Sequence, residues 1–140
     1  MFGFGKKKNK EDNKPFNLKD VSYLNKKELA LHNKLKAKLG EHLLPGESLI
    51  GETSCAGGSY FLTQKRMLMI CPVIPGKVKK VMVESFYYGE IASVTYKDGI
   101  LGLGSLEIHL KGNIVKGCPT LYQKPCKEIY KILNSKISYK

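Results

Sequence analysis

Between residues 48 and 117, apolar and polar residues alternate in short runs separated by turn-forming residues. Alternation with a period of two is typical of half-buried β-strands, and the glycine, proline and asparagine between the runs favour turns. The predicted strands are Ser48–Cys55, Tyr60–Thr63, Arg66–Cys71, Lys79–Phe86, Glu90–Lys97, Ser105–Leu110 and Ile114–Gly117. The second and third runs form either one continuous strand or a strand bent near residues 64–65. We expect turns at 56–59, 98–99 and 111–113, and a loop over 72–77.

The spacing becomes helical before the strand region. Residues 25–43 place Leu31, Leu35, Leu39 and Leu43 at steps of four, which makes one apolar stripe on a helix. Asn25 can cap this helix with Glu28 in the capping-box position, and Pro45-Gly46 ends it. We expect the stripe to pack on the strands, and contact with a partner or a membrane surface is the alternative.

A second amphipathic helix follows the strands. Its apolar face is formed by Tyr122, Cys126, Ile129, Tyr130, Leu133 and Ile137, and Pro119 and Pro125 fall at or before its first turn. This order predicts an α+β protein of about seven antiparallel strands whose open mouth is covered by the last helix. An OB-fold would place a helix between its third and fourth strands, and an Sm-like barrel lacks the long last helix. We divide the chain into a basic arm (1–20), an N-terminal helix (21–45) and the strand domain with its capping helix (46–140).

The segment Phe61–Ile70 resembles a motif of the bacterial PH-like domains (the bPH and YokE-like group), which carry a Leu-Thr-Asn-Lys-Arg-Leu-like sequence across their second and third strands. Leu43–Glu47 is similar to their Leu-x-x-Gly-Glu lead-in, and Tyr88–Val94 is similar to a strand ending in Ile-Ser-Ser-Val. Further likeness in 101–110 and 126–133 extends the resemblance over residues 43–137. It implies a PH-like antiparallel β-barrel or sandwich closed by a C-terminal helix, and a non-catalytic adaptor with no implied ligand. Eukaryotic PH domains that bind phosphoinositides carry Lys and Arg around the first hairpin, whereas residues 48–64 contain neither.

The chain carries 24 Lys and Arg against 12 Asp and Glu, a net charge of +12, and Arg66 is its one arginine. Arginine makes the bidentate contacts that read guanine and phosphate, so sequence-specific nucleic-acid recognition is disfavoured. Non-specific attraction to an anionic partner stays open. A soluble, lysine-rich surface explains the same composition without any partner.

Two lysine clusters are the candidate binding sites. In the arm, Lys6, Lys7, Lys8 and Lys10 follow Phe2 and Phe4; we expect a mobile tail, and a tether for an anionic surface is the functional alternative. Lys77, Lys79 and Lys80 lie at a predicted turn that we expect near the first hairpin, where they can meet phosphates or an acidic partner. Solvated lysines that discourage sheet aggregation are the plainer interpretation of this second cluster.

We find no pattern typical of a catalytic, metal or cofactor site. The four cysteines have no CxxC spacing, and Cys55 and Cys71 are expected in the core rather than in a disulfide framework. His32 and His42 are expected to be surface or flank residues, and a Cys-His pair, which can meet only in space, is the alternative. The glycines of 99–104 join two strands and do not precede a helix, so they indicate a turn and not a nucleotide site. We therefore expect a protein that is not an enzyme and that needs no metal or cofactor.

Three functions remain. The leading one is an adaptor that binds an as yet unidentified protein partner through a barrel edge or a helix groove. Peripheral binding to an anionic membrane surface is the second, non-specific nucleic-acid binding is the third, and a homo-oligomer stays open. The first residues lack the apolar segment of a signal peptide, and no run approaches the ~20 residues of a membrane span. The expected location is the cytoplasm, with a membrane-peripheral position as the alternative.

Overall fold

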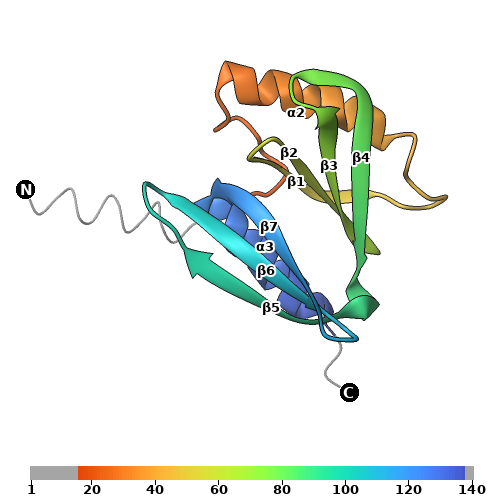
Figure 1. Cartoon of the computed structure of the whole chain (residues 1–140), viewed down its shortest axis with the longest axis vertical. Helices are drawn as coiled ribbons and strands as arrows, with labels where there is room; N and C mark the ends of the chain where they lie inside the picture. Colours follow the sequence, from red (N-terminus) through yellow and green to blue (C-terminus); the bar gives the residue numbers. More distant parts are fainter. Residues whose placement is uncertain (1–15, 138–140) are drawn as a thin grey trace, which may run out of the picture.

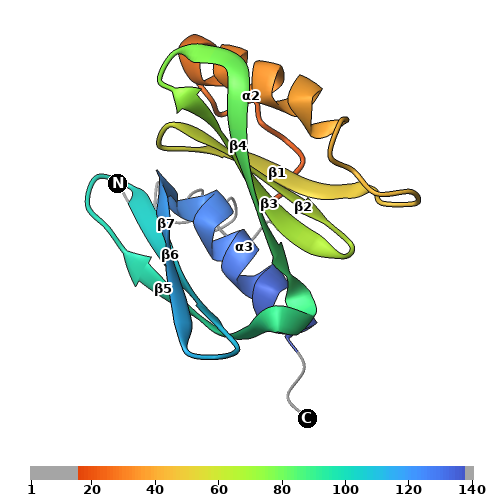
Figure 2. The same ribbon diagram turned by 45° about the vertical axis from the view of Figure 1, so that its right-hand side comes forward.

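The computed structural model describes residues 16–137, in which seven strands form two antiparallel sheets (Figure 1). Sheet A contains β1 (Leu49–Cys55), β2 (Gly58–Thr63), β3 (Arg66–Ile74) and β4 (Lys77–Tyr87), and sheet B contains β5 (Ile91–Asp98), β6 (Leu103–Leu110) and β7 (Ile114–Tyr122). Helix α2 (Lys26–Leu39) precedes sheet A, the 3-10 helix η1 (Tyr88–Glu90) joins the sheets, and α3 (Gln123–Lys136) follows sheet B. Figure 2 shows the two helices on different sides of sheet A, with α3 next to sheet B.

Sheet A follows the predicted order with tighter turns than expected. The first hairpin turn is confined to Ala56-Gly57, because Gly58 already pairs with Cys55. Gly58 lies so close to β3 that a Cβ here would come within 2.7 Å of the Ile70 carbonyl oxygen. The predicted loop over 72–77 was wrong: β3 runs on to Ile74, and only Pro75-Gly76 turns the chain. The prolines misled the prediction because proline is tolerated near a strand end and in a turn.

Sheet B departs from the prediction at its last strand. We expected that strand to end at Gly117 and Pro119 to lie at the helix start, but β7 continues to Tyr122. Pro119 falls where the pairing skips, since Gly104 pairs with Leu121 while Leu106 pairs with Cys118. A bulge on an edge strand accepts a residue without a backbone N–H. The helix consequently begins at Gln123.

Helix α2 packs on the outer face of sheet A. Asn25 and Glu28 form the predicted capping box, and the helix ends at Leu39 rather than at residue 43. Leu35 and Leu39 are buried against three side chains of the sheet, namely Phe61, Leu68 and Ile70. The predicted packing of the leucine stripe on the strands is therefore confirmed.

The main core lies between the inner faces of the two sheets and α3. Tyr60 of β2, Ile108 of β6 and Ile129 and Leu133 of α3 are all inaccessible to solvent. The expected closure by the last helix is confirmed. The seven strands nevertheless form two separate sheets, so the fold is a sandwich and not a closed barrel.

A buried ion pair connects the lead-in to β1 with the start of β3. The Nε and Nη2 atoms of Arg66 donate to the two carboxylate oxygens of Glu47 at 2.9 and 3.0 Å. Arg66 also donates to the His42 carbonyl oxygen and to Ser85 Oγ, and Thr63 Oγ1 donates to Glu47. The hydrogen bonds from Arg66 are the main reason why the pKa of Glu47 is lowered to about 2. The one arginine of the chain thus serves the interior of the fold.

A second polar cluster lies under α2 and corrects the prediction for His32. This side chain is fully buried instead of lying at the surface. Its Nε2 lies 2.8 Å from Glu52 Oε1, its Nδ1 lies 2.8 Å from Ser59 Oγ, and its ring stacks on Phe61. Lys36 of α2 donates to the other oxygen of Glu52. His32, one turn before Leu35 on α2, therefore faces the sheet through polar contacts.

Candidate functional site

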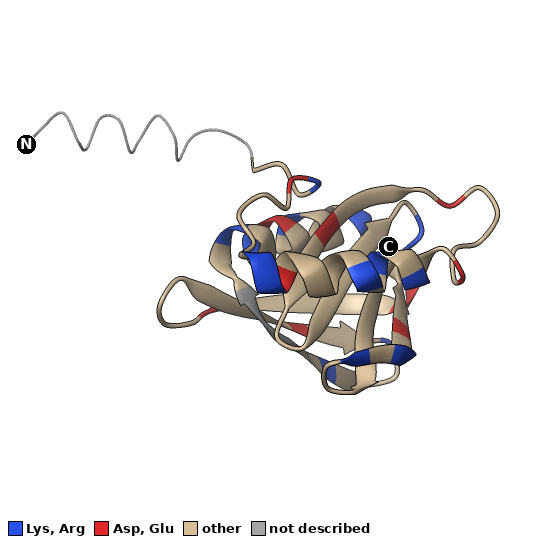
Figure 3. Ribbon diagram, turned by 90° about the horizontal axis from the view of Figure 1, so that it is seen from above, with Lys and Arg blue, Asp and Glu red and all other residues tan. Residues whose placement is uncertain are grey.

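The lysines within residues 16–137 are spread over several elements, including α2 and the start of β4, and do not gather at one site (Figure 3). Lys77, Lys79 and Lys80 are exposed in the first residues of β4. Between the pairs Pro72–Val81 and Ile74–Lys77, β3 has one residue and β4 has three. The two extra residues produce a bulge at Lys79 and Lys80. A bulge with lysines blocks pairing at this part of the edge. Lys6, Lys7, Lys8 and Lys10 lie outside the described residues.

A cavity of about 630 Å³ opens beside this strand, between α2 and two hairpin turns. The β1–β2 turn at Ala56-Gly57 and the β3–β4 turn at Pro75-Gly76 both line it, so the two turns are adjacent, as expected. Its basic groups are Lys27 and Lys34 of α2, and none of the three predicted lysines of β4 lines it. Such a shallow site is compatible with many ligands, and its buried polar residue, Ser54, already donates a hydrogen bond to the Gly58 carbonyl oxygen.

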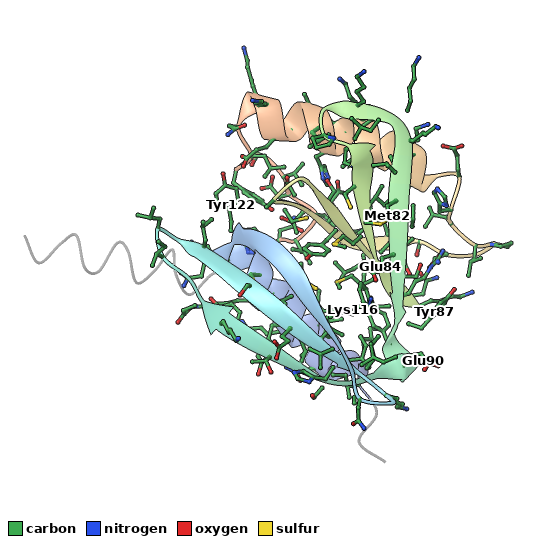
Figure 4. All side chains as sticks on the ribbon, viewed as in Figure 1. Met82, Glu84, Tyr87, Glu90, Lys116 and Tyr122 are labelled. Carbon is green, nitrogen blue, oxygen red and sulfur yellow. The ribbon has the colours of Figure 1, made fainter. Side chains whose placement is uncertain are left out.

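A more distinctive surface lies where the sandwich opens between β4 and β7 (Figure 4). Met82 and Glu84 of β4 and Ile114 and Lys116 of β7 belong to the inner faces of their sheets, because each shares a face with a core residue of its own strand. Met82 is 53% exposed and Ile114 is 52% exposed, although inner faces are normally covered. Lys116 Nζ lies 3.3 Å from Glu84 Oε2 across the gap. We call these four residues the open corner.

The open corner lies beside a free strand edge. β4 pairs with β3 on one side and with no described strand on the other. After the lysine bulge, the pairing with β3 is regular from Val81 to Tyr87, which is the stretch that carries Met82 and Glu84. An unpaired edge presents a row of backbone donors and acceptors to any added strand. The open corner therefore combines an available edge, two apolar side chains and one pair of opposite charges.

One buried row of polar side chains is closed to substrates. Ser59, His32 and Glu52 are arranged in a hydrogen-bonded row, but Ser59 and His32 are inaccessible to solvent, so no substrate can reach the hydroxyl. Burial raises the pKa of Cys55 and of Cys126 to about 12, which keeps both thiols protonated and unreactive at neutral pH. Among the described residues, no group of three His, Cys, Asp or Glu is placed to hold a metal ion. Within residues 16–137, no helix has the length and apolar character needed to cross a membrane.

Comparison with known proteins identifies the architecture. No family model and no curated protein matches the chain. A pleckstrin homology domain from Shewanella amazonensis SB2B is 23% identical with a TM-score of 0.53, over 74% of this chain and 95% of that chain. A DUF1696 family protein with a pleckstrin-homology domain from Shewanella loihica PV-4 is 20% identical with a TM-score of 0.54, over 80% and 92%.

The chain has a pleckstrin-homology (PH) fold. The resemblance to bacterial PH-like domains is confirmed at the level of the fold, and at these identities the likeness concerns the fold alone. In this PH-like domain, two of the motifs that carried the resemblance meet in space: Leu43–Glu47 supplies Glu47 and Phe61–Ile70 supplies Arg66. Their buried ion pair connects the two segments inside the domain.

Sequence reasoning missed the residues that make this PH-like domain distinctive at its surface. Met82 was expected on a strand, but its exposure depends on how far sheet B extends, which no local pattern records. Lys116 had no recognisable partner in sequence because Glu84 lies 32 positions away. Edge strands of a sandwich are detectable only when the order of strands in each sheet is known.

Proposed function

We propose that this PH-like domain is a non-catalytic protein-interaction module that receives an extended segment of a partner along β4 at the open corner. The observation that carries the proposal is the exposure of Met82 and Ile114 on inner sheet faces, beside the free edge of β4. Inner faces that remain half exposed in a sandwich mark a surface on which another chain can complete the packing.

Strand addition explains each component of the open corner. Backbone hydrogen bonds from a partner strand would satisfy the free edge, and alternate side chains of that strand would reach Met82 and Ile114. The ion pair of Glu84 and Lys116 can be opened at low cost, because both side chains are partly solvated and such pairs stabilise by only about 0–1 kcal/mol. The lysine bulge at residues 79–80 limits the partner to the second half of β4 and opposes uncontrolled sheet aggregation.

Photo-crosslinking tests this proposal directly. A photoreactive amino acid placed at Met82 or at Ile114 of the full chain, expressed in the native host, should give the same covalent adduct. The matched control places it at Thr95, which is exposed on the outer face of sheet B. Adducts of equal yield from all three positions, or none from Met82 and Ile114, would contradict the proposal.

A further inference from the structure

The tip of the β5–β6 hairpin exposes two large apolar side chains. Ile100 is 79% exposed and Leu101 is 92% exposed, the highest values among the large apolar residues described. Leu101 and Gly102 have φ values of 55° and 74°, and the Leu103 N–H donates to the Ile100 carbonyl oxygen. This is a type I′ turn, in which Asn-Gly is the favoured central pair.

A leucine at this position is unfavourable for the fold on two counts. Positive φ is strained for any residue with a branched or bulky side chain, and the exposed leucine contacts water. At the opposite end of sheet B, the β6–β7 turn places positive φ on Gly112 and Asn113, which adopt it readily. The chain therefore uses ordinary turn chemistry at one end of the sheet and an apolar tip at the other. Strain and exposure that the fold does not need are typical of a contact site.

Three lysines lie on the elements that adjoin the apolar tip. Lys97 lies on β5 just before the turn, and Lys124 and Lys127 lie in the first turns of α3. The start of α3 is held at the tip, because the Gln123 N–H donates to the Gly102 carbonyl oxygen. The one acidic side chain placed there by the hairpin, Asp98, accepts hydrogen bonds from Tyr96 and from Gln123.

The first described residue, Phe16, also lies on this side of the domain. The Phe16 ring lies 5.6 Å from the Tyr23 ring, which lies 5.7 Å from the Tyr122 ring. Tyr122 pairs with Leu103, the residue that follows the type I′ turn. The fifteen residues before Phe16 carry five lysines and two acidic residues. The described part of the chain therefore begins close to the tip, and this cationic sequence precedes it.

We infer that the β5–β6 tip inserts Ile100 and Leu101 into the interfacial region of a lipid bilayer that contains anionic lipids, with Lys97, Lys124 and Lys127 on the headgroups. A convex tip of two side chains is far smaller than the ~800 Å² per partner of a stable protein interface, whereas it suits the entry of apolar groups among lipids. The lysines complement an anionic headgroup layer. This inference goes beyond the proposed function, since the tip and the open corner lie toward opposite ends of sheet B (Figure 1). One domain could then hold a partner strand at a membrane.

The absence of tryptophan from the chain provides a clean test. The variant Ile100→Trp introduces a single indole at the tip, and its emission should shift to shorter wavelength with phosphatidylcholine vesicles containing phosphatidylglycerol, but not with phosphatidylcholine alone. Val115→Trp, at a half-exposed site near the other end of sheet B, is the matched control and should show no shift. An unshifted Ile100→Trp, or equal shifts in both variants, would overturn the inference.

Co-sedimentation of the full chain with the same vesicles measures the contribution of the tip. Leu101→Asn should lower the partition coefficient by roughly tenfold or more, because one inserted apolar side chain is lost. Val115→Asn removes a comparable apolar side chain elsewhere and should leave the coefficient unchanged. Ile74→Asn tests the exposed end of β3 next to Lys77. If binding falls with Ile74→Asn, or only on deletion of residues 2–14, while Leu101→Asn binds normally, the assignment of the tip is wrong.

Discussion

The domain reverses the usual distribution of side chains at two places, with opposite consequences. Around sheet A it buries charged and polar groups, namely Glu47 with Arg66 and Glu52 with His32. At the β5–β6 tip it exposes Ile100 and Leu101. Each buried charge has a hydrogen-bond partner on another element, so these buried groups hold the elements of the fold together. Ile100 and Leu101 have no such partners, and the positive φ of Leu101 adds backbone strain, so their exposure does not stabilise the fold.

This contrast separates residues of the fold from residues of the surface function. Buried charges are costly to leave unpaired, so removing one partner should destabilise the domain strongly. An exposed leucine in a strained turn costs free energy of folding, so replacing it should stabilise the domain while weakening a contact outside it. Measurements of stability can therefore test this contrast without knowledge of any partner.

The largest effect is expected from loss of the arginine. Arg66→Met should lower the free energy of unfolding by about 3–5 kcal/mol, because Glu47 is left buried without its counter-charge. Lys65→Met, at the exposed neighbouring position, is the control and should change it by less than about 0.5 kcal/mol. Urea denaturation of both variants measures the difference. Similar midpoints for the two variants would show that the ion pair does not hold the fold.

The buried histidine should matter nearly as much. His32→Ala leaves Ser59 Oγ and one carboxylate oxygen of Glu52 without their hydrogen-bond partner and opens a cavity under α2, which should cost about 2–4 kcal/mol. His42→Ala is the matched control, because the His42 side chain is exposed and only its backbone carbonyl contacts Arg66. Equal denaturation midpoints for the wild type and His32→Ala would refute a structural role for this cluster.

Acid should weaken the domain through Glu47. Its pKa is about 2 in the folded state, below the ordinary value of 4.5, so its contribution is complete above pH 4.5 and is lost as the pH falls toward 2. This contribution is on the order of 2–3 kcal/mol. The difference in stability between the wild type and Glu47→Gln should therefore shrink over that pH range. A difference that stays constant from pH 6 to pH 2.5 would contradict the assigned ionisation.

The smallest effect has the opposite sign. Leu101→Asn should raise the free energy of unfolding by about 1 kcal/mol and the melting temperature by about 3 °C, because asparagine adopts positive φ more readily. Asn113→Leu is the mirror change at the other turn and should lower stability by a similar amount. Calorimetry of both variants measures these two changes in stability. A loss of stability in Leu101→Asn would mean that the leucine serves the fold after all.

Much of the fold could be predicted from local patterns. The capping box of Asn25 and Glu28 and the turn at Gly112 and Asn113 depend on residues within four positions of one another, so the sequence displays them directly. The errors occurred where a local signal was ambiguous. Pro119 is compatible with a helix start or a bulged edge strand, and only its place opposite β6 distinguished the two.

The sequence alone determined the order of helices and strands, the turns and the resemblance to PH-like domains, because periodicity and backbone preferences act over a few residues. Tertiary structure alone decided that His32 is buried, that Glu47 meets Arg66, and that β4 and β7 leave an open corner. Those features join residues from 19 to 32 positions apart. Such contacts arise from the packing of sheets and helices on one another, which no short stretch of the chain specifies.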